Sequence, residues 1–375
     1  MSSEPILIVG AGLGGLALAQ ALRRKNIPFR IFERDAQYGV REQGWAISLH
    51  PWLIADLCSG VRDDEAGLRR MTPSAPLGMH SEGVIYSLEK ETRKELFRFG
   101  EGTDQPFVRV ERTKLRDWLL QEVSVEWNKR FQGYEQHPNG ITARFEDGTE
   151  VQGSVLVGAD GISSQVRRQL LNSHDEPQRL PIGIVVGQVE ATHEQYQRWL
   201  KLGTSLSIGF TDTRRLFVGL KSVSKDLRKA QFYWMFGWAD KNAKKTPYWT
   251  NSASQSKLHN FVMENLHGLD AEYTEPFRAT PVEGILQPPL QMRDMLPPTL
   301  PRGRVTLLGD AVHPMGGNMA IKDAIVLAET LAQTTTFHDT ADILKQYESE
   351  MSERAGKSVI TSRENTFMHK CIFNK

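Results

Sequence analysis

The fold of this chain is decided by one stretch, Ile6-Leu7-Ile8-Val9-Gly10-Ala11-Gly12-Leu13-Gly14-Gly15. Its first four residues are apolar and predict a buried strand, and the Ala- and Leu-rich run that continues to Lys25 predicts a helix. The glycines between them follow the spacing G-x-G-x-x-G. A second apolar run, Phe29–Phe32, follows the helix. Together these features predict a strand-helix-strand unit of the Rossmann type.

The glycine spacing has a specific chemical meaning. Gly10 permits the tight turn, Gly12 lets the backbone approach a pyrophosphate, and Gly15 lets the helix pack closely on the strand. The N-terminus of the helix then attracts the phosphate charge. About 20 residues further on, Glu33 can accept hydrogen bonds from an adenosine ribose, whereas it would repel a phosphorylated ribose. The predicted dinucleotide site comprises Gly10, Gly12, Leu13, Gly14, Gly15, Glu33 and Arg34. The motif alone leaves both FAD and NAD open.

Composition excludes several other classes of protein. Lys plus Arg total 46 against 45 for Asp plus Glu, without a long run of one sign, so no nucleic-acid or anionic-membrane footprint is expected. The two cysteines, Cys58 and Cys371, lack metal-ligand spacing, so neither a metal site nor a disulfide framework is expected. No stretch approaches the roughly 20 apolar residues of a membrane helix. We therefore expect a cytoplasmic protein without an integral membrane span, as a monomer or homodimer.

The middle of the chain predicts a second lobe. A helix is predicted over Arg112–Leu120, a hairpin over residues 140–151 and a buried strand over residues 155–157. Strands rich in aromatic and β-branched residues then recur, which predicts a mixed or antiparallel sheet. These strands cover residues 183–189, 205–210, 216–220 and 232–236. The polar, Lys-rich residues 240–257 predict an exposed loop.

Two later segments complete the pattern. One reads Val155-Leu156-Val157-Gly158-Ala159-Asp160-Gly161. The other reads Gly303-Arg304-Val305-Thr306-Leu307-Leu308-Gly309-Asp310-Ala311-Val312-His313-Pro314, and a helix is predicted to follow it from about residue 318. With the glycine motif, and in this order, they resemble the motifs of the single-component FAD-dependent aromatic hydroxylases, the family of para-hydroxybenzoate hydroxylase. The resemblance implies that the dinucleotide is FAD.

The resemblance also implies roles for individual residues. In this family the aspartate of the Gly-Asp motif binds the ribityl chain of FAD, which assigns Asp310 to that chain. The helix that follows directs its N-terminus at the flavin ring, where its positive end would stabilise the anionic reduced flavin. This assigns the amides of Gly317, Asn318 and Met319 to the ring. Asp160, in the Asp-Gly motif, is assigned to the same cofactor.

Other residues keep two interpretations. Arg41 and Arg112 stand where relatives place arginines beside the dinucleotide, and a guanidinium suits a pyrophosphate, but a surface ion pair would also explain either residue. His313 could be a general base, although in relatives the His-Pro pair shapes a turn. Five aromatic residues of the second lobe could line a substrate cavity or pack in the core. They are Phe210, Phe217, Tyr233, Trp234 and Phe236.

The implied fold is α/β, with a Rossmann-like FAD-binding domain of the GR2 type, an inserted mixed β-sheet substrate domain and C-terminal helices. The FAD-binding domain would comprise residues 1–72, 106–180 and 290–375, and the substrate-binding lobe residues 73–105 and 181–289. The implied enzyme uses NAD(P)H and O2 to hydroxylate or epoxidise an aromatic or polycyclic small molecule through a flavin hydroperoxide. With a single dinucleotide motif, NAD(P)H would bind as a transient co-substrate. No residue is assigned a catalytic role.

One departure from the family pattern lies beside the expected flavin ring. Relatives carry several more residues before the flavin-facing helix, whereas Met315 here meets Gly316-Gly317-Asn318 directly. Either the loop is shorter or the sequence omits a mobile segment, and we expect the glycines to act as a hinge. Two other functions stay open on this fold. One is an FAD oxidase or dehydrogenase that transfers no oxygen, and the other is a flavin-binding protein without oxygenase activity.

Overall fold

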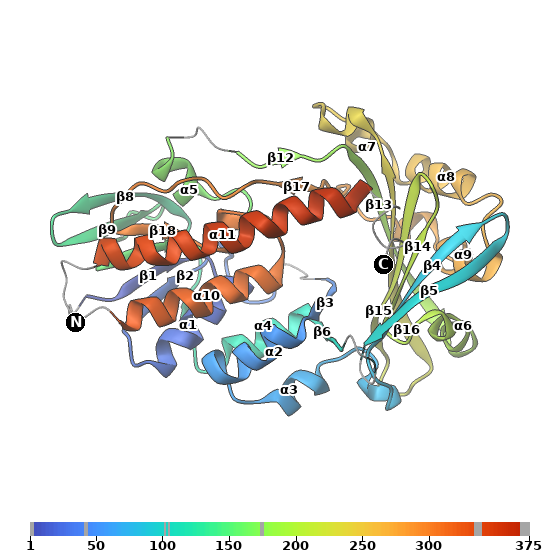
Figure 1. Cartoon of the computed structure of the whole chain (residues 1–375), viewed down its shortest axis with the longest axis horizontal. Helices are drawn as coiled ribbons and strands as arrows, with labels where there is room; N and C mark the ends of the chain where they lie inside the picture. Colours follow the sequence, from blue (N-terminus) through green and yellow to red (C-terminus); the bar gives the residue numbers. More distant parts are fainter. Residues whose placement is uncertain are drawn as a thin grey trace.

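The computed structural model describes residues 4–40, 44–100, 103, 106–172, 176–333 and 340–367. These residues form two halves that lie side by side along the long axis of the molecule (Figure 1). A five-stranded parallel sheet is the centre of one half, and a six-stranded mixed sheet is the centre of the other. A short antiparallel ribbon, β3 (Ala46–Leu49) with β6 (Val108–Glu111), lies between the two sheets.

The parallel sheet contains the predicted strand-helix-strand unit. Its strands are, in spatial order, β18 (Val305–Leu307), β11 (Val155–Gly158), β1 (Ile6–Val9), β2 (Phe29–Phe32) and β7 (Val125–Glu126). β1 is buried along its whole length, as a strand covered on both faces must be. The chain leaves β1 toward β2 and later adds β11 on the other side. The carboxyl end of β1 is therefore a topological switch point, where α/β proteins bind their ligands.

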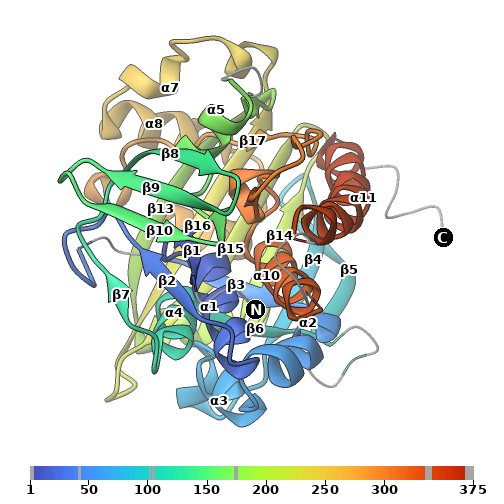
Figure 2. The same ribbon diagram turned by 90° about the vertical axis from the view of Figure 1, so that its left-hand side faces the viewer.

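Helices cover one face of this sheet and a small antiparallel sheet covers the other (Figures 1 and 2). The helical side contains α1 (Leu13–Arg24), α4 (Arg112–Leu120), α10 (Gly317–Ala332) and α11 (Thr340–Phe367). The other side contains β8 (Phe131–His137), β9 (Gly140–Phe145), β10 (Glu150–Gly153) and α5 (Gln165–Leu170). In α1 the residues from Leu13 to Leu22 are all buried, and Asn26, with a φ of +55°, follows its end.

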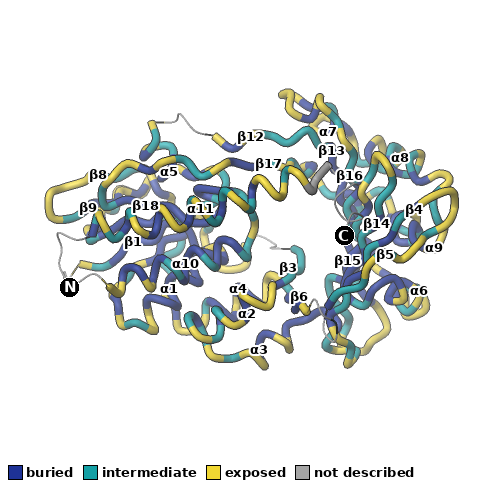
Figure 3. Tube along the Cα trace, in the orientation of Figure 1, coloured by how far each residue is buried: buried dark blue, intermediate teal, exposed yellow. Residues whose placement is uncertain are grey.

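The mixed sheet has one face covered by helices. Its strands are, in spatial order, β13 (Ile182–Thr192), β16 (Lys229–Ala239), β15 (Arg214–Val223), β14 (Leu206–Phe210), β4 (Glu82–Glu89) and β5 (Thr92–Gly100). The β14–β4 pair is parallel and the other pairs are antiparallel. The helices are α6 (His193–Trp199), α7 (Trp249–Ser252), α8 (Gln255–Asn265) and α9 (Ala271–Arg278). Exposed residues gather on these helices, whereas the central strands are mostly buried (Figure 3).

The four strands predicted for the second lobe correspond to β13, β14, β15 and β16. The hairpin of β4 and β5 was not predicted, and it joins the same sheet through β14. Residues 240–257 are mostly exposed, as predicted, but the prediction of a loop is wrong, because α7 and the start of α8 lie there. Tyr248 is buried in this segment, and its hydroxyl donates to Asp240 Oδ2 at 2.8 Å. The polar composition of this segment gave no sign that a buried tyrosine attaches it to the core.

The remaining α-helices and strands complete the connections. They are α2 (Pro51–Asp56), α3 (Glu65–Arg70), β12 (Gln178–Arg179) and β17 (Arg293–Asp294). β12 and β17 pair antiparallel on the path between the halves (Figure 1). Among the described residues, no helix is both long enough and apolar enough to cross a membrane. The same residues contain no cluster of three or more His, Cys, Asp or Glu side chains suited to a metal ion.

Candidate functional site

The glycine turn joins β1 to α1 at the switch point. Gly10 has a φ of +109°, and a Cβ there would lie 2.4 Å from the carbonyl oxygen of Ala159. At Gly15 a Cβ would lie 2.0 Å from the carbonyl oxygen of Gly10. Gly12 differs, because no atom lies within 4 Å of its Cβ position and no side chain caps α1. The first amides of α1 therefore open onto free space, as they do at helix N-termini that bind anions.

Glu33 follows β2 and holds this turn in place. Its Oε2 accepts a hydrogen bond from the amide of Ala11 at 2.8 Å, and its Oε1 accepts one from the amide of Asp35 at 3.1 Å. A carboxylate has about four acceptor sites, so these two hydrogen bonds do not exclude a ribose hydroxyl as another donor. The motif predicts the position of Glu33 but not its contact with the turn.

A cavity of about 420 Å³, the turn cavity, lies beside the glycine turn. Asp160 lines it, and its Oδ2 accepts hydrogen bonds from the amides of Gln165 at 2.7 Å and Val166 at 3.3 Å. Burial raises the pKa of Asp160. Its buried Oδ1 has no hydrogen-bond partner among the described residues. Since buried polar atoms are almost always satisfied, this oxygen indicates a donor that the described chain does not supply.

A second cavity of about 570 Å³, the sheet cavity, is lined by the start of α10, the ribbon of β3 and β6, and strands β14, β15 and β16. The two cavities share Gly12, Arg112, Ala159 and Gly161 in their linings. Arg112 is the first residue of α4, and no described residue forms a hydrogen bond or ion pair with its guanidinium. Burial lowers the pKa of Arg112, although the charge of Asp310 opposes this effect. A cation without a bonded partner therefore stands where the cavities meet.

The start of α10 borders the sheet cavity. Gly316 precedes the helix with a φ of +81°, and no side chain caps it. Asp310 lines the cavity and its Oδ1 accepts a hydrogen bond from the amide of Gly316 at 3.3 Å. Burial raises the pKa of the Asp310 carboxyl, against the opposing effects of that hydrogen bond and of the charge on Arg112. The cavity thus places a carboxylate beside a helix end whose amides are uncapped.

The next three residues attach α10 to its surroundings. A Cβ at Gly317 would lie 2.4 Å from Cδ1 of Ile47, so glycine lets the helix start approach β3. The side-chain amide of Asn318 donates to the carbonyl of Ser48 at 2.7 Å. Met319 is buried and does not line either cavity, so the structure does not bring it into the site with Gly317 and Asn318.

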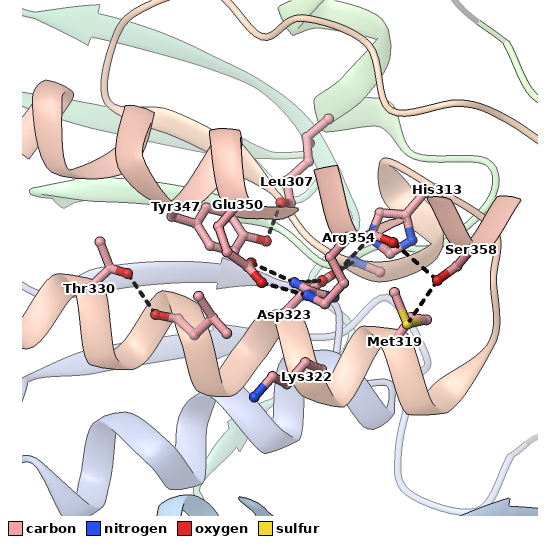
Figure 4. A network of polar contacts seen from close by, with 12 residues as sticks. Leu307, His313, Met319, Lys322, Asp323, Thr330, Tyr347, Glu350, Arg354 and Ser358 are labelled. Atoms are coloured by element: carbon pink, nitrogen blue, oxygen red, sulfur yellow. Dashed lines mark hydrogen bonds and ion pairs between the residues drawn. The ribbon is translucent and has the colours of Figure 1, made fainter. Parts of the chain in front are cut away.

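His313 is packed behind these cavities rather than in their linings. Its side chain is fully buried, and its Nε2 lies 2.8 Å from Oδ2 of Asp323 in α10. Asp323 also accepts a hydrogen bond from the amide of Gly309 at 2.7 Å and pairs with Arg354 of α11 at 3.0 Å (Figure 4). Burial alone would raise the pKa of Asp323, but His313 and Arg354 hold it below its usual value. This network supports a structural role for His313 rather than that of a general base.

Strand period decides which aromatic residues reach the sheet cavity. Phe217 of β15 and Tyr233 of β16 line it. Trp234 and Phe236 alternate with Tyr233 along β16 and are fully buried in the core beneath the outer helices. Phe210 of β14 lies outside the cavity lining. Of the five candidates, Phe217 and Tyr233 therefore keep the interpretation of cavity residues.

The lining also contains Trp45 and Arg109, which were not predicted as site residues. Trp45 stacks on Tyr233, with ring centroids 5.7 Å apart and planes 7° from parallel. Trp45, Phe217 and Tyr233 are called the aromatic wall below. Arg109 of β6 also lines the cavity and is 1% exposed. An arginine between Val108 and Val110, two buried apolar residues of the same strand, was the available signal.

Most predicted site residues lie around the two cavities. The turn cavity is lined by Gly10, Gly12, Glu33, Arg34, Arg112 and Asp160. The sheet cavity is lined by Gly12, Leu13, Gly14, Arg112, Asp310, Gly317 and Asn318. Gly15 packs under the turn, Met319 lies outside both cavity linings, and Arg41 lies outside the described residues.

Known proteins are similar to this chain in sequence and in fold. Residues 3–362 match the family model described as FAD binding domain. The FAD-dependent monooxygenase thnD of Trichoderma harzianum is 36% identical, over 96% of this chain and 92% of its own length. The structure of Klebsiella pneumoniae HpxO complexed with FAD and uric acid has a TM-score of 0.76 at 22% identity, covering 99% of this chain and 91% of that one. The structure of 2,6-dihydroxypyridine-3-hydroxylase from Arthrobacter nicotinovorans has a TM-score of 0.75 at 19% identity, covering 97% and 92%.

Proposed function

The chain belongs to the FAD-binding-domain family of FAD-dependent monooxygenases, and on this basis we propose that it uses NAD(P)H and O2 to hydroxylate or epoxidise an aromatic or polycyclic small molecule. The observation that carries the proposal is the junction of the two cavities at Gly12 and Arg112. On one side of this junction lie donors suited to phosphates, and on the other lies the aromatic wall. A long cofactor and an organic ring can therefore share one site.

The residues of the site fit FAD. The uncapped start of α1, the guanidinium of Arg112 and the unpartnered Oδ1 of Asp160 are polar groups left for a ligand. We assign the pyrophosphate to the glycine turn and Arg112, the adenosine ribose to Glu33, and the ribityl chain to Asp310. The amides of Gly317, Asn318 and Met319 are assigned to the flavin ring, and Arg34 and Asp160 to the cofactor end of the turn cavity. Arg41 remains a proposed second guanidinium.

The protein contributes positioning and electrostatics to the reaction. FAD, once reduced by NAD(P)H, supplies the activation of dioxygen. The uncapped amides at the start of α10 present a positive potential that stabilises negative charge beside them. The aromatic wall holds an organic ring and keeps water away from it. The reaction therefore depends on residues that bind the cofactor and the organic ring and exclude water, rather than on a side-chain nucleophile.

The proposal assigns FAD binding and substrate binding to different parts of the chain. FAD binding is assigned to residues 1–72, 106–180 and 290–375, a GR2-type domain, and substrate binding to the inserted residues 73–105 and 181–289. Strand pairing supports this assignment. β4 and β5, from the first insertion, share one sheet with β13 to β16, from the second. β1, β11 and β18, from the three FAD-binding segments, share the other.

Oxygen labelling tests the proposed function. The FAD-loaded protein is supplied with NADPH, ¹⁸O₂ and a panel of aromatic and polycyclic compounds. We expect at least one compound to stimulate NADPH oxidation and to gain one labelled oxygen per NADPH consumed. Stoichiometric hydrogen peroxide without labelled product would identify an oxidase. Absence of substrate-stimulated NADPH oxidation would favour a flavin-binding protein, and either result would overturn the proposal.

A further inference from the structure

Arg109 is a buried cation that is surrounded by neutral groups. Its Nη1 donates to the carbonyl of Ser205 at 2.9 Å and to that of Leu220 at 3.0 Å, and its Nη2 donates to the hydroxyl of Tyr233. Within the described part of the chain, no carboxylate pairs with this guanidinium. A buried charge without a counter-charge is costly, so its retention beside a cavity calls for an explanation.

Tyr233 accepts a hydrogen bond from Arg109 and can itself donate one to a ligand. Its hydroxyl accepts the hydrogen bond from Arg109, so its own proton remains to be donated. No described residue accepts that proton. Burial raises the pKa of Tyr233 despite the nearby guanidinium, so the phenol keeps its proton at neutral pH. Both side chains line the sheet cavity and offer donors without offering an anionic acceptor.

Gly219 makes room for this arrangement. A Cβ at Gly219 would lie 2.9 Å from Nη2 of Arg109 and 2.8 Å from the ring of Phe217. Gly219 lies opposite Tyr233 in the pairing of β15 with β16. Glycine weakens a strand interior, and it often marks a place where another group must approach the backbone closely. Here that group is the guanidinium at the cavity wall.

We propose that Arg109 and Tyr233 bind an acidic oxygen of the substrate, either a carboxylate or an ionised enol. This inference rests on the proposed function, because it names the class of organic molecule that the sheet cavity accepts. An anionic oxygen supplies the missing counter-charge and receives charge-assisted hydrogen bonds. Arg112, the other arginine of the lining, is assigned to the cofactor. Asp310 also lines the cavity, and its carboxylate would repel an acid bound on that side.

Paired ligands test the proposal in the FAD-loaded protein without NADPH. The first pair is 2-naphthoate and 2-naphthamide, and the second is 4-hydroxycoumarin, as its ionised enol, and 4-methoxycoumarin. Dissociation constants are measured from the change in the flavin absorbance. We expect at least one acid to bind about tenfold more tightly than its neutral partner. Arg109→Gln should weaken the binding of that acid by roughly 10- to 100-fold and leave the binding of its neutral partner unchanged.

Three further variants separate charge, geometry and stability. Arg109→Lys should retain part of the preference, because it keeps the charge but not the planar fork. Gly219→Ala should reduce the preference while keeping both polar residues, because it displaces the guanidinium. Arg214→Gln is the control. Arg214 belongs to β15 and donates to the carbonyl of Asn265 at 2.8 Å outside the cavity lining, so its loss should leave the preference unchanged.

The outcomes are distinct. Preference for naphthoate alone assigns a carboxylate, preference for hydroxycoumarin alone assigns an ionised enol, and both results support an anionic substrate. If neither acid binds more tightly than its partner, or if Arg109→Gln weakens both members of a pair equally, Arg109 only clamps β6 to the mixed sheet and the proposal is overturned. Because the readout is binding without turnover, a failure of oxygen transfer would leave this result intact.

Discussion

At the scale of single residues, glycines of one motif serve different purposes. Gly15 is enclosed by backbone, since its Cβ would lie 2.0 Å from a carbonyl oxygen, whereas the Cβ position of Gly12 is open. A side chain at Gly15 therefore disturbs the fold. A side chain at Gly12 enters the space assigned to the pyrophosphate and leaves the fold intact. Comparing these two positions separates cofactor binding from stability.

We expect Gly12→Val to fold normally and to lose FAD. The φ of −77° at Gly12 is accessible to valine, so the apo protein should keep its melting temperature. The affinity for FAD should fall by about 2 kcal/mol or more, roughly 30-fold, because the valine occupies the ligand's space. Gly15→Val should instead lower stability by about 3 kcal/mol through overpacking. Flavin titration and thermal unfolding of both apo proteins check this, and full FAD binding by Gly12→Val would refute the assignment of the turn.

The residues that sequence could place are those whose motif encodes backbone geometry. Gly10, Gly12 and Glu33 form one local unit, so their spacing predicted where they lie. Arg109 could not be placed in this way, because its carbonyl partners at Ser205 and Leu220 are about a hundred residues away in sequence. Its role depends on how the ribbon of β3 and β6 meets the mixed sheet, which residue spacing does not encode.

At the scale of elements, Asp323 joins α10 to α11 and to the turn after β18. It contacts His313 and Arg354 in a fully buried position (Figure 4). We expect Asp323→Asn to lower the free energy of unfolding at pH 7 by about 3 to 5 kcal/mol, because it removes the buried carboxylate that faces His313 and leaves Arg354 with Glu350 alone as its counter-charge. The exposed pair of Arg302 and Asp342 provides the control, and Asp342→Asn should cost less than about 1 kcal/mol.

The loss from Asp323→Asn should also depend on pH. The pKa of Asp323 is lowered in the folded protein, so its contribution is fully present above the unfolded value of about 4 and disappears as the pH falls through the folded value. The stability difference between wild type and variant should therefore shrink below about pH 4. Denaturant unfolding at pH 7 and at lower pH measures it. A difference that is constant with pH would show that shape rather than charge accounts for the loss.

The start of α10 allows a matched pair of substitutions at Gly317. Proline is well tolerated at the first position of a helix but removes the amide, whereas alanine keeps the amide. Either substitution places a Cβ near Ile47, so their steric effects are similar. We expect Gly317→Pro to slow flavin reduction by NADPH about tenfold relative to Gly317→Ala, because it removes a donor assigned to the flavin ring. Rapid-mixing kinetics check this. Equal rates of flavin reduction in the two variants would show that the amide of residue 317 has no role in the reaction.

The residue pattern and length of each segment predicted most helices and strands, but not which elements they pack against or pair with. The aromatic composition of residues 232–236 identified a strand, yet which of Tyr233 and Trp234 faces the cavity depends on the side of the sheet that α8 and α9 cover. The β4–β5 hairpin was missed because β5 is rich in charged residues, which left β4 without a recognisable partner strand. Its place in the mixed sheet comes from pairing with β14, more than a hundred residues later in the chain.

At the scale of the whole molecule, the site lies where the two sheets face each other. The parallel sheet supplies the glycine turn and Asp160, the mixed sheet supplies Phe217 and Tyr233, and the ribbon of β3 and β6 brings in Arg109. Neither sheet alone encloses the sheet cavity. Trp45, directly before β3, stacks on Tyr233 of β16, so one ring contact joins the ribbon to the mixed sheet.

We expect Trp45→Ala to uncouple the reaction while FAD stays bound. Its loss opens the cavity beside Tyr233, and water that enters should divert electrons from the organic product to hydrogen peroxide. Trp45→Phe should restore much of the coupling, because a ring can still stack there. Trp249→Ala is the control, since Trp249 packs against Phe261, 5.1 Å between ring centroids, outside both cavity linings. The ratio of peroxide to NADPH consumed measures the effect. An unchanged ratio in Trp45→Ala would show that closure of the site depends on other residues, and an equal rise in Trp249→Ala would point to general loosening of the mixed sheet.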